Sequence, residues 1–273
     1  MGLANVRLGY WWDSGVDPDN RPGDGRPHAG WRRAFTAALP VYSFLLGELL
    51  ARFRGTAWRH WYLSDGGHFE NLGGYELIRR RLPLIVLVDA EADPHGRFDG
   101  LAGLIRKARI DFGADIRFLD EAALERMGLR SLFGPLEELR ATRALAASPQ
   151  GASAAGTAAL STRHFALARV SYRAEQGEPP TEGWLVYSKP TLTGAEPADL
   201  IEYLRAHPAF PHEPTSDQFF GEDQWESYRM LGEHLAGLLC STAPDDGGSW
   251  RFAELLRNGG VAAEPPTAGD TTR

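Results

Sequence analysis

An aspartate followed by two glycines, Asp65, Gly66 and Gly67, stands where a turn could present a carboxylate for chemistry. Residues 61–64 (WYLS) have the character of a short strand that enters this turn. In open α/β sheets, ligands gather beyond the carboxyl ends of the strands, and an acid that directly follows a strand lies in that zone. Local composition by itself favours a plain turn, since Asp and Gly are common turn residues. Asp65 is therefore either a base or a turn residue.

A metal ion is a second possibility, because His68 and Glu70 add an imidazole and a carboxylate beside the turn. The spacing of zinc motifs is absent, however, and the single cysteine of the chain excludes a cysteine-rich zinc site. Residues 89–100 (DAEADPHGRFDG) imitate a calcium loop, but the twelfth position is Gly100, where such a loop needs glutamate. We therefore expect no metal ion and no other cofactor.

A helix is predicted after the turn. Leu72, Tyr75 and Ile78 recur at helical spacing, and Asn71 stands where an N-cap is expected. We accordingly assign Asn71 to support of the turn by capping. Three arginines, 79–81, close the helix, where cations suit the helix dipole.

The segments that follow predict an α/β fold. Residues 84–90 (LIVLVDA) form an unbroken apolar run, typical of a strand buried on both faces, so we expect 84–89 to be a central strand. A helix over about 99–112 and a strand at 115–119 complete a strand–helix–strand unit. This order favours a mostly parallel central sheet.

The second half of the chain predicts further elements of the same sheet. Residues 164–172 and 183–192 suggest an antiparallel pair that extends it. Helices are expected over about 197–206 and 221–240.

Composition limits the partners. The 273 residues carry a formal net charge of −7, which gives no basic surface for nucleic acid. The first residues lack the pattern of a signal peptide, and no stretch reaches the roughly 18 apolar residues of a membrane span. We expect a cytoplasmic location with at most peripheral membrane contact. One domain is expected over 1–260, followed by a disordered tail at 261–273.

A family resemblance lies in the same residues. Residues 64–94 (SDGGHFENLGGYELIRRRLPLIVLVDAEADP) strongly resemble the segment that carries the catalytic aspartate in bacterial patatin-like phospholipases. The Asp-x-Gly and Asn-Leu pattern is also similar to that of the cytosolic phospholipases with the same catalytic fold. Residues 4–15, 187–220 and 224–235 resemble the bacterial branch in the same order, so the resemblance covers most of the chain.

The resemblance implies a lipid acyl hydrolase with a layered α/β fold and a Ser–Asp dyad. Asp65 matches the dyad aspartate, which would accept the proton of the serine hydroxyl during attack on the ester carbonyl. Gly66 and Gly67 match the glycines that shape the turn. The implied substrate is a phospholipid or another acyl-ester lipid. A base of this kind works best when it is partly shielded from water.

The chain departs from the family at the nucleophile. No Gly-x-Ser-x-Gly elbow occurs in it, and the nearest imitation, 151–156 (GASAAG), has one residue too many after Ser153. Ser14 has no elbow either, and a glycine-rich oxyanion loop is absent from the sequence. The chain is thus expected to be the C-terminal portion of such an enzyme, inactive alone and incomplete at its N-terminal side. A core that lacks its first strands should expose an apolar sheet edge.

Two alternatives stay open beside a fragment of a phospholipase. The first is a chain that pairs with a separate serine-bearing polypeptide, and the second is a non-catalytic module that binds acyl chains or a partner. The complete Asp-Gly-Gly segment argues against the second alternative, because binding alone does not require a dyad acid.

Overall fold

The computed structural model describes residues 9–15, 38–52, 59–145, 158–174, 181–214 and 216–240. Contacts divide the chain into two compact units, Met1–Asn71 and Leu72–Arg273, and each is described by itself. The expected single domain over 1–260 stays a prediction, and the expected tail at 261–273 lies outside the described residues.

The first unit contains four described elements: β1 (Gly9–Asp13), α2 (Pro40–Leu49), β2 (His60–Ser64) and the 3-10 turn η3 (Gly66–His68). The strand expected at 61–64 is confirmed as β2, which pairs antiparallel with β1. Helix α2 begins at Pro40, because proline lacks an N–H and is tolerated only in the first turn. Trp11 joins the helix to the hairpin by stacking on Phe44 and donating a hydrogen bond of 2.7 Å to Glu48.

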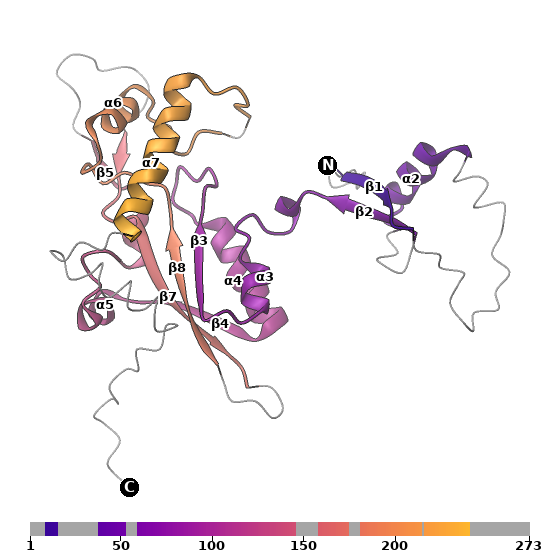
Figure 1. Cartoon of the computed structure of the whole chain (residues 1–273), viewed down its shortest axis with the longest axis horizontal. Coiled ribbons are helices and arrows are strands. Elements are labelled where there is room, and N and C mark those ends of the chain that lie inside the picture. The colour runs from indigo at the N-terminus through magenta and orange to yellow at the C-terminus, as the bar shows by residue number, and fades with distance from the viewer. Residues whose placement is uncertain are drawn as a thin grey trace, which may run out of the picture. The chain divides into compact units, whose positions relative to one another are not determined.

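The second unit contains the main sheet. Its described helices and strands are α3 (Tyr75–Arg79), β3 (Leu84–Val88), α4 (Asp99–Phe112), β4 (Ala114–Phe118), α5 (Glu121–Met127), η4 (Leu136–Leu139), β5 (Arg143–Ala144), β6 (Ala159–Leu160), β7 (Phe165–Tyr172), β8 (Glu182–Ser188), α6 (Ala198–Ala206) and α7 (Glu222–Cys240). The four long strands form one sheet in the order β3-β8-β7-β4, and β5 and β6 form a separate pair (Figure 1).

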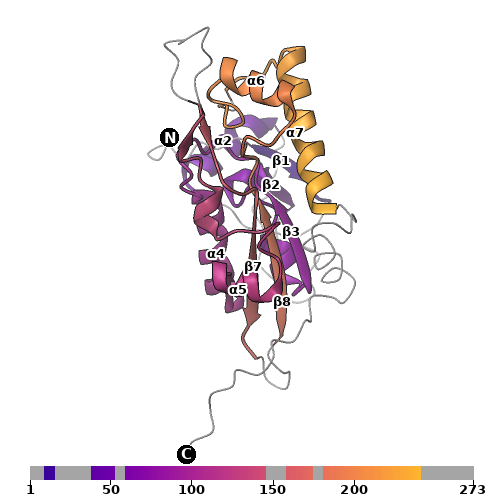
Figure 2. The same ribbon diagram turned by 90° about the vertical axis from the view of Figure 1, so that its left-hand side faces the viewer.

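The sheet is mixed rather than mostly parallel. Strand β3 pairs parallel with β8, whereas β7 pairs antiparallel with both β8 and β4. Strands β3, β8 and β4 therefore point the same way, as the strand–helix–strand pattern requires. The expected antiparallel pair is confirmed, but it lies between β3 and β4 in place of extending the sheet. Strands β3, β8 and β7 lie side by side in both views (Figure 1 and Figure 2).

The prediction that residues 84–89 form a central strand buried on both faces is wrong. Among the described strands, β3 is at the edge of the sheet. Ile85 and Leu87 are buried, but Val86 and Val88 are 41% and 62% exposed. The reason is that the apolar run covers both faces of the strand while the rest of the unit covers only one. An exposed edge at 84–89 counts against the patatin-like architecture, and with it against the patatin assignment, because both expectations placed this strand at the centre of the sheet. The exposed strand does agree with a second expectation, that an incomplete core exposes an apolar sheet edge.

Helices cover the two faces of the sheet differently (Figure 1). Strand residues such as Ala168 and Leu185 pack against α3 and α4, where Ile78 and Leu104 are fully buried. The alternate residues Leu167 and Val186 pack on the opposite face, against α5, α6 and α7. This alternation follows from the two-residue period of a strand. The central strands β7 and β8 are thus buried on both faces.

Local signals set the ends of several helices. Helix α4 ends at Gly113, whose φ of 59° is left-handed and suits glycine. Helix α5, which the sequence analysis did not predict, is capped by Asp120, whose side chain accepts a hydrogen bond of 2.8 Å from the N–H of Ala123. The helices expected near 99–112, 197–206 and 221–240 are confirmed as α4, α6 and α7.

Among the described residues, no helix combines the length and the apolar character needed to cross a bilayer.

Candidate functional site

The Asp65 turn directly follows β2. The Oδ1 atom of Asp65 accepts a hydrogen bond of 2.8 Å from the N–H of Gly67, and so the side chain caps the 3-10 turn. In the described part of the chain, this is the hydrogen bond that the carboxylate makes, which leaves Oδ2 able to accept a proton. The carboxylate is thereby anchored by one oxygen while the other stays available.

The two glycines of the turn are required to different degrees. A Cβ on Gly67 would lie 2.3 Å from Oδ1 of Asn71 and 3.3 Å from Oδ1 of Asp65, so only glycine fits there without a shift. A Cβ on Gly66 would meet nothing within 4 Å. The close approach at Gly67 explains why the turn can fold back on its own aspartate.

Exposure of Asp65 differs from what a dyad base needs. Its side chain is exposed, and the described residues of its unit do not shield it from water. The expected shielding must therefore come from a substrate or another segment if Asp65 acts as a base.

The predicted capping role of Asn71 is wrong. Helix α3 begins at Tyr75 with Gly74 as its N-cap, and no side chain caps it. The cause is Gly73, whose φ of 67° interrupts the helical pattern of residues 72–78. Asn71 instead places its amide oxygen beside the Gly67 backbone, where it lines the back of the aspartate turn.

A serine and a histidine meet in the same turn, which the sequence analysis missed. The Ser64 hydroxyl lies 2.9 Å from Nδ1 of His68, within the hydrogen-bond reach of a nucleophile and its base. The signal was a serine four residues before a histidine across a tight turn. Both side chains are exposed, so water competes with this contact. Of the two serines that the sequence analysis weighed as nucleophiles, Ser14 donates to the carbonyl of Arg59 at 2.7 Å, and Ser153 lies outside the described residues.

A buried ion pair occupies the carboxyl ends of β3 and β8. The Lys189 ammonium is 3.0 Å from Oδ1 of Asp89, and these side chains are 2% and 1% exposed. Tyr187 donates its hydroxyl hydrogen to Oδ2 of Asp89. Lys189 also donates a hydrogen bond of 2.9 Å to the carbonyl of Glu91. Burial, followed by the charge of Asp89, raises the pKa of Tyr187, so the phenol stays a donor. The pair lies in the zone where α/β sheets bind ligands, but its burial indicates that it joins two strands.

The acidic loop after β3 uses its carboxylates internally. Asp93 accepts hydrogen bonds from the N–H groups of Arg97 and Phe98 at 2.9 and 2.7 Å. Burial alone would raise the pKa of Asp93, but these two hydrogen bonds outweigh it and lower the pKa. Asp93, one of the acids that imitate a calcium loop, therefore organises the loop by binding its backbone.

His212 lies beside this loop, and its buried imidazole should make the free energy of unfolding depend on pH. Burial, and then the charge of Lys189, lower the pKa of His212 to about 4. Its Nδ1 accepts a hydrogen bond of 3.3 Å from the N–H of Asp93, as a neutral imidazole can. An unfolded histidine titrates near about 6.5, so between these values the unfolded chain binds more protons. The stabilising effect is complete above about pH 6.5 and is lost as the pH falls towards 4, by roughly 3 kcal/mol at most.

We expect His212→Asn to flatten the dependence of the unfolding free energy on pH between 5 and 7, measured by urea denaturation. The amide oxygen can still accept from Asp93 but does not titrate. The matched control is His95→Asn, because His95 is an exposed histidine near the same loop. Equal pH slopes in the His212 variant and the unmodified chain would contradict the assignment.

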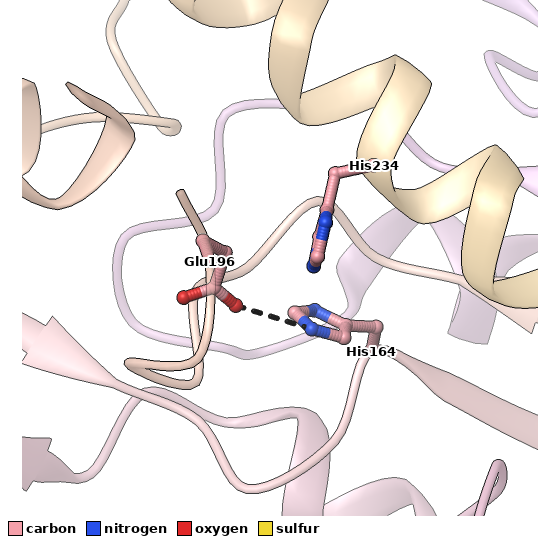
Figure 3. Close-up of side chains that lie close together, drawn as sticks. All are labelled: His164, Glu196 and His234. Atoms are coloured by element: carbon pink, nitrogen blue, oxygen red, sulfur yellow. Dashed lines mark ion pairs between the residues drawn. The ribbon is translucent and has the colours of Figure 1, made fainter. Parts of the chain in front are cut away.

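Three metal-ligating side chains meet elsewhere in the second unit (Figure 3). His164 precedes β7, Glu196 precedes α6, and His234 lies on α7. The nearest ligand atoms of the three residues all lie within 4.8 Å of one another. Nε2 of His164 is 3.2 Å from Oε1 of Glu196, and these two side chains are 8% and 0% exposed. The sequence analysis missed this cluster because its members come from three separate segments.

Glu196 is held as a carboxylate in this cluster. Burial by itself would raise the pKa of Glu196, but hydrogen bonds from His164 and from the backbone outweigh burial and lower the pKa to about 2. Thr193 donates to Oε1 from its N–H and its hydroxyl at 2.7 and 2.8 Å, and the N–H of Gly194 donates to Oε2 at 2.8 Å. The carboxylate is therefore charged and fixed in orientation at neutral pH.

Comparisons with known proteins do not place the chain in a family. No protein-family model, no curated protein and no solved structure matches it.

Proposed function

We propose that this chain is the aspartate-bearing portion of a patatin-like lipid acyl hydrolase, in which Asp65 is the base of a Ser–Asp dyad. The observation that carries the proposal is the geometry of the turn. Asp65 directly follows a strand, is anchored through Oδ1 by the Gly67 N–H, and keeps Oδ2 available for a proton. An aspartate that served only the turn would need Oδ1 but not Oδ2.

The serine and the oxyanion donors must come from a segment or partner chain that the 273 residues do not contain. Loss of both removes the groups that attack the ester and stabilise the developing charge, which costs many orders of magnitude in rate. The edge position of β3 agrees with this arrangement, because further strands can pair with an exposed edge. Val86 and Val88 supply apolar side chains that such strands would cover.

The chain by itself is expected to show no hydrolysis of short acyl esters above the buffer background. The measurement is release of a chromogenic leaving group, followed by labelling with a serine-directed fluorophosphonate. Ser64→Ala provides the internal check, because Ser64 is the described serine with an imidazole at 2.9 Å. Ester hydrolysis that the fluorophosphonate abolishes would contradict the proposal. If that hydrolysis is also lost in Ser64→Ala, the active group is a Ser–His pair.

The coding DNA distinguishes the two forms of the proposal. A segment just upstream that encodes a glycine-rich loop and a Gly-x-Ser-x-Gly elbow, in frame or shifted, supports a portion of one longer enzyme. A separate gene for a serine-bearing polypeptide supports assembly from two chains.

A non-catalytic module that binds acyl chains or a lipid surface is the second candidate. Helix α2 favours it, because none of its residues is buried in the structure. Its exposed large apolar side chains are Val41, Tyr42, Leu45, Leu46 and Leu49. Contiguous apolar surface of this kind marks sites for lipid or protein contact. Acyl-chain or vesicle binding that does not depend on Asp65 would favour this candidate over the hydrolase.

A further inference from the structure

We propose that His164, Glu196 and His234 form a binding site for a zinc-like divalent cation. The site lies between the start of β7, the loop before α6, and α7 (Figure 3), and it shares no residue with the Asp65 turn. Two imidazoles and one carboxylate are a ligand set that Zn²⁺ accepts.

The distances fit a tetrahedral ion. Ligand atoms at the usual bond lengths of about 2.0–2.1 Å from zinc lie about 3.3 Å from one another along a tetrahedral edge. Nε2 of His164 and Oε1 of Glu196 are 3.2 Å apart, which matches such an edge. The nearest ring nitrogen of His234 lies within 4.8 Å of both, so the ring has to approach them more closely to complete a tetrahedral edge of about 3.3 Å. The fourth position is then left for water.

His234 is the member whose position points to a ligand. Leu231 and Leu235 are buried on the same helix, so His234 is carried on the side of α7 that packs against the sheet. Its ring lies edge-on to His164, with centroids 6.2 Å apart. Within the described residues, the ring nitrogens of His234 make no hydrogen bond. A polar ring that faces a buried His–Glu pair without such a bond fits a metal ligand.

The surroundings of His164 and Glu196 also fit a metal. A metal-binding histidine usually donates its second ring N–H to a neighbouring acceptor. Nδ1 of His164 is 3.5 Å from the hydroxyl of Thr191, a buried group that Ser161 contacts at 2.9 Å. The donors from Thr193 and Gly194 orient Glu196, two of them at Oε1 and one at Oε2. Both buried ligands are thus oriented before an ion binds.

The alternative is a metal-free ion pair between His164 and Glu196 with His234 as a neighbour. It explains the 3.2 Å contact, and it leaves the ring nitrogens of the partly buried His234 to water. The two accounts differ in what they predict for His234, because only a metal ligand makes cation binding depend on it.

The test uses the full chain after removal of metal with a chelator. Titration with Zn²⁺ alone, followed calorimetrically, is expected to show a single site, together with a rise in the melting temperature. His234→Ala should weaken binding at least about 100-fold, which exceeds the usual loss for a residue that merely supports a ligand. His234→Glu, which supplies another ligand atom, should recover part of the affinity, and Ca²⁺ should not compete.

His95→Ala is the matched control, since it removes an exposed histidine outside the cluster. His234 is only partly buried, so its variants are expected to fold, and their melting temperatures without zinc verify this. The proposal is overturned if the chain binds no Zn²⁺, or if His234→Ala binds it as the unmodified chain does. Loss of binding in His95→Ala would equally overturn it, because the ion would then lie at surface histidines.

Discussion

Lys189→Met is expected to lower the free energy of unfolding by about 3–5 kcal/mol, the usual cost of removing one partner of a buried ion pair. Asp89 would stay 1% exposed with its charge unmatched, although Tyr187 would still donate to it. The backbone carbonyl of Glu91 would also lose the ammonium as a donor. Methionine fills a similar volume, so packing loss contributes little. Urea denaturation at pH 7 measures the change.

Arg205→Met is the matched control for this prediction. It also replaces a cation with methionine, but in a surface pair with Glu202 at 3.7 Å whose side chains are 40% and 75% exposed. Exposed pairs of this kind contribute about 0–1 kcal/mol. If Lys189→Met costs no more than Arg205→Met, the buried pair does not hold the two strands together.

A double variant separates the charge from the contact. Asp89→Asn removes the negative charge and keeps an oxygen that can accept from the N–H of Glu91. Combined with Lys189→Met, it should recover a large part of the stability lost in the single variant, because no unmatched charge stays buried. Equal stability of the single and double variants would show that the loss comes from packing.

Elements with a local pattern could be predicted from the sequence. Helix α4 has its apolar residues at helical spacing and a glycine directly after its end, so its bounds followed from residues 99–113 alone. The hairpin of β7 and β8 likewise followed from two β-rich runs and the turn between them. Such signals depend only on residues that are close in the sequence, so they do not depend on the tertiary structure.

Strand order and strand burial could not be predicted in this way. The run 84–90 is apolar at every position, which fits burial on both faces but equally fits one buried face and one exposed edge. Whether the strand is central or at the edge depends on where the β7–β8 hairpin inserts into the sheet. That hairpin is far along the chain, so residues 84–90 carry no signal of its position. The cap predicted at Asn71 failed for a related reason, since a positive φ at Gly73 moved the start of α3.

The functional residues also differ in whether the sequence could predict that they lie together. The Asp65 turn could be found from three adjacent residues, because its anchor is the N–H two residues further on. The Asp89–Lys189 pair could not, because it exists only through the parallel pairing that sets Val88 opposite Ser188. The His164, Glu196 and His234 cluster depends similarly on how α7 packs against the sheet.

Asp65→Asn is expected to reduce the rate of ester hydrolysis at least about 100-fold, the lower end for loss of a general base. The measurement needs the serine-bearing segment, fused to this chain or supplied in trans. Asparagine keeps the oxygen that accepts from Gly67 but loses the second oxygen as a proton acceptor. The turn should therefore survive, with the free energy of unfolding within about 1 kcal/mol of the unmodified protein.

Two further variants separate chemistry from the turn. Asp65→Ala should lose activity to the same extent, and it should also cost about 0.5–2 kcal/mol because the Gly67 N–H loses its cap. Asp99→Asn makes the same chemical change at a side chain that is 78% exposed, and it should leave the rate unchanged and the free energy of unfolding within about 1 kcal/mol. Hydrolysis and thermal melting are measured side by side on all three proteins. If Asp65→Asn keeps a near-normal rate, or loses activity only in proportion to unfolding, Asp65 is a turn residue and the dyad assignment is wrong.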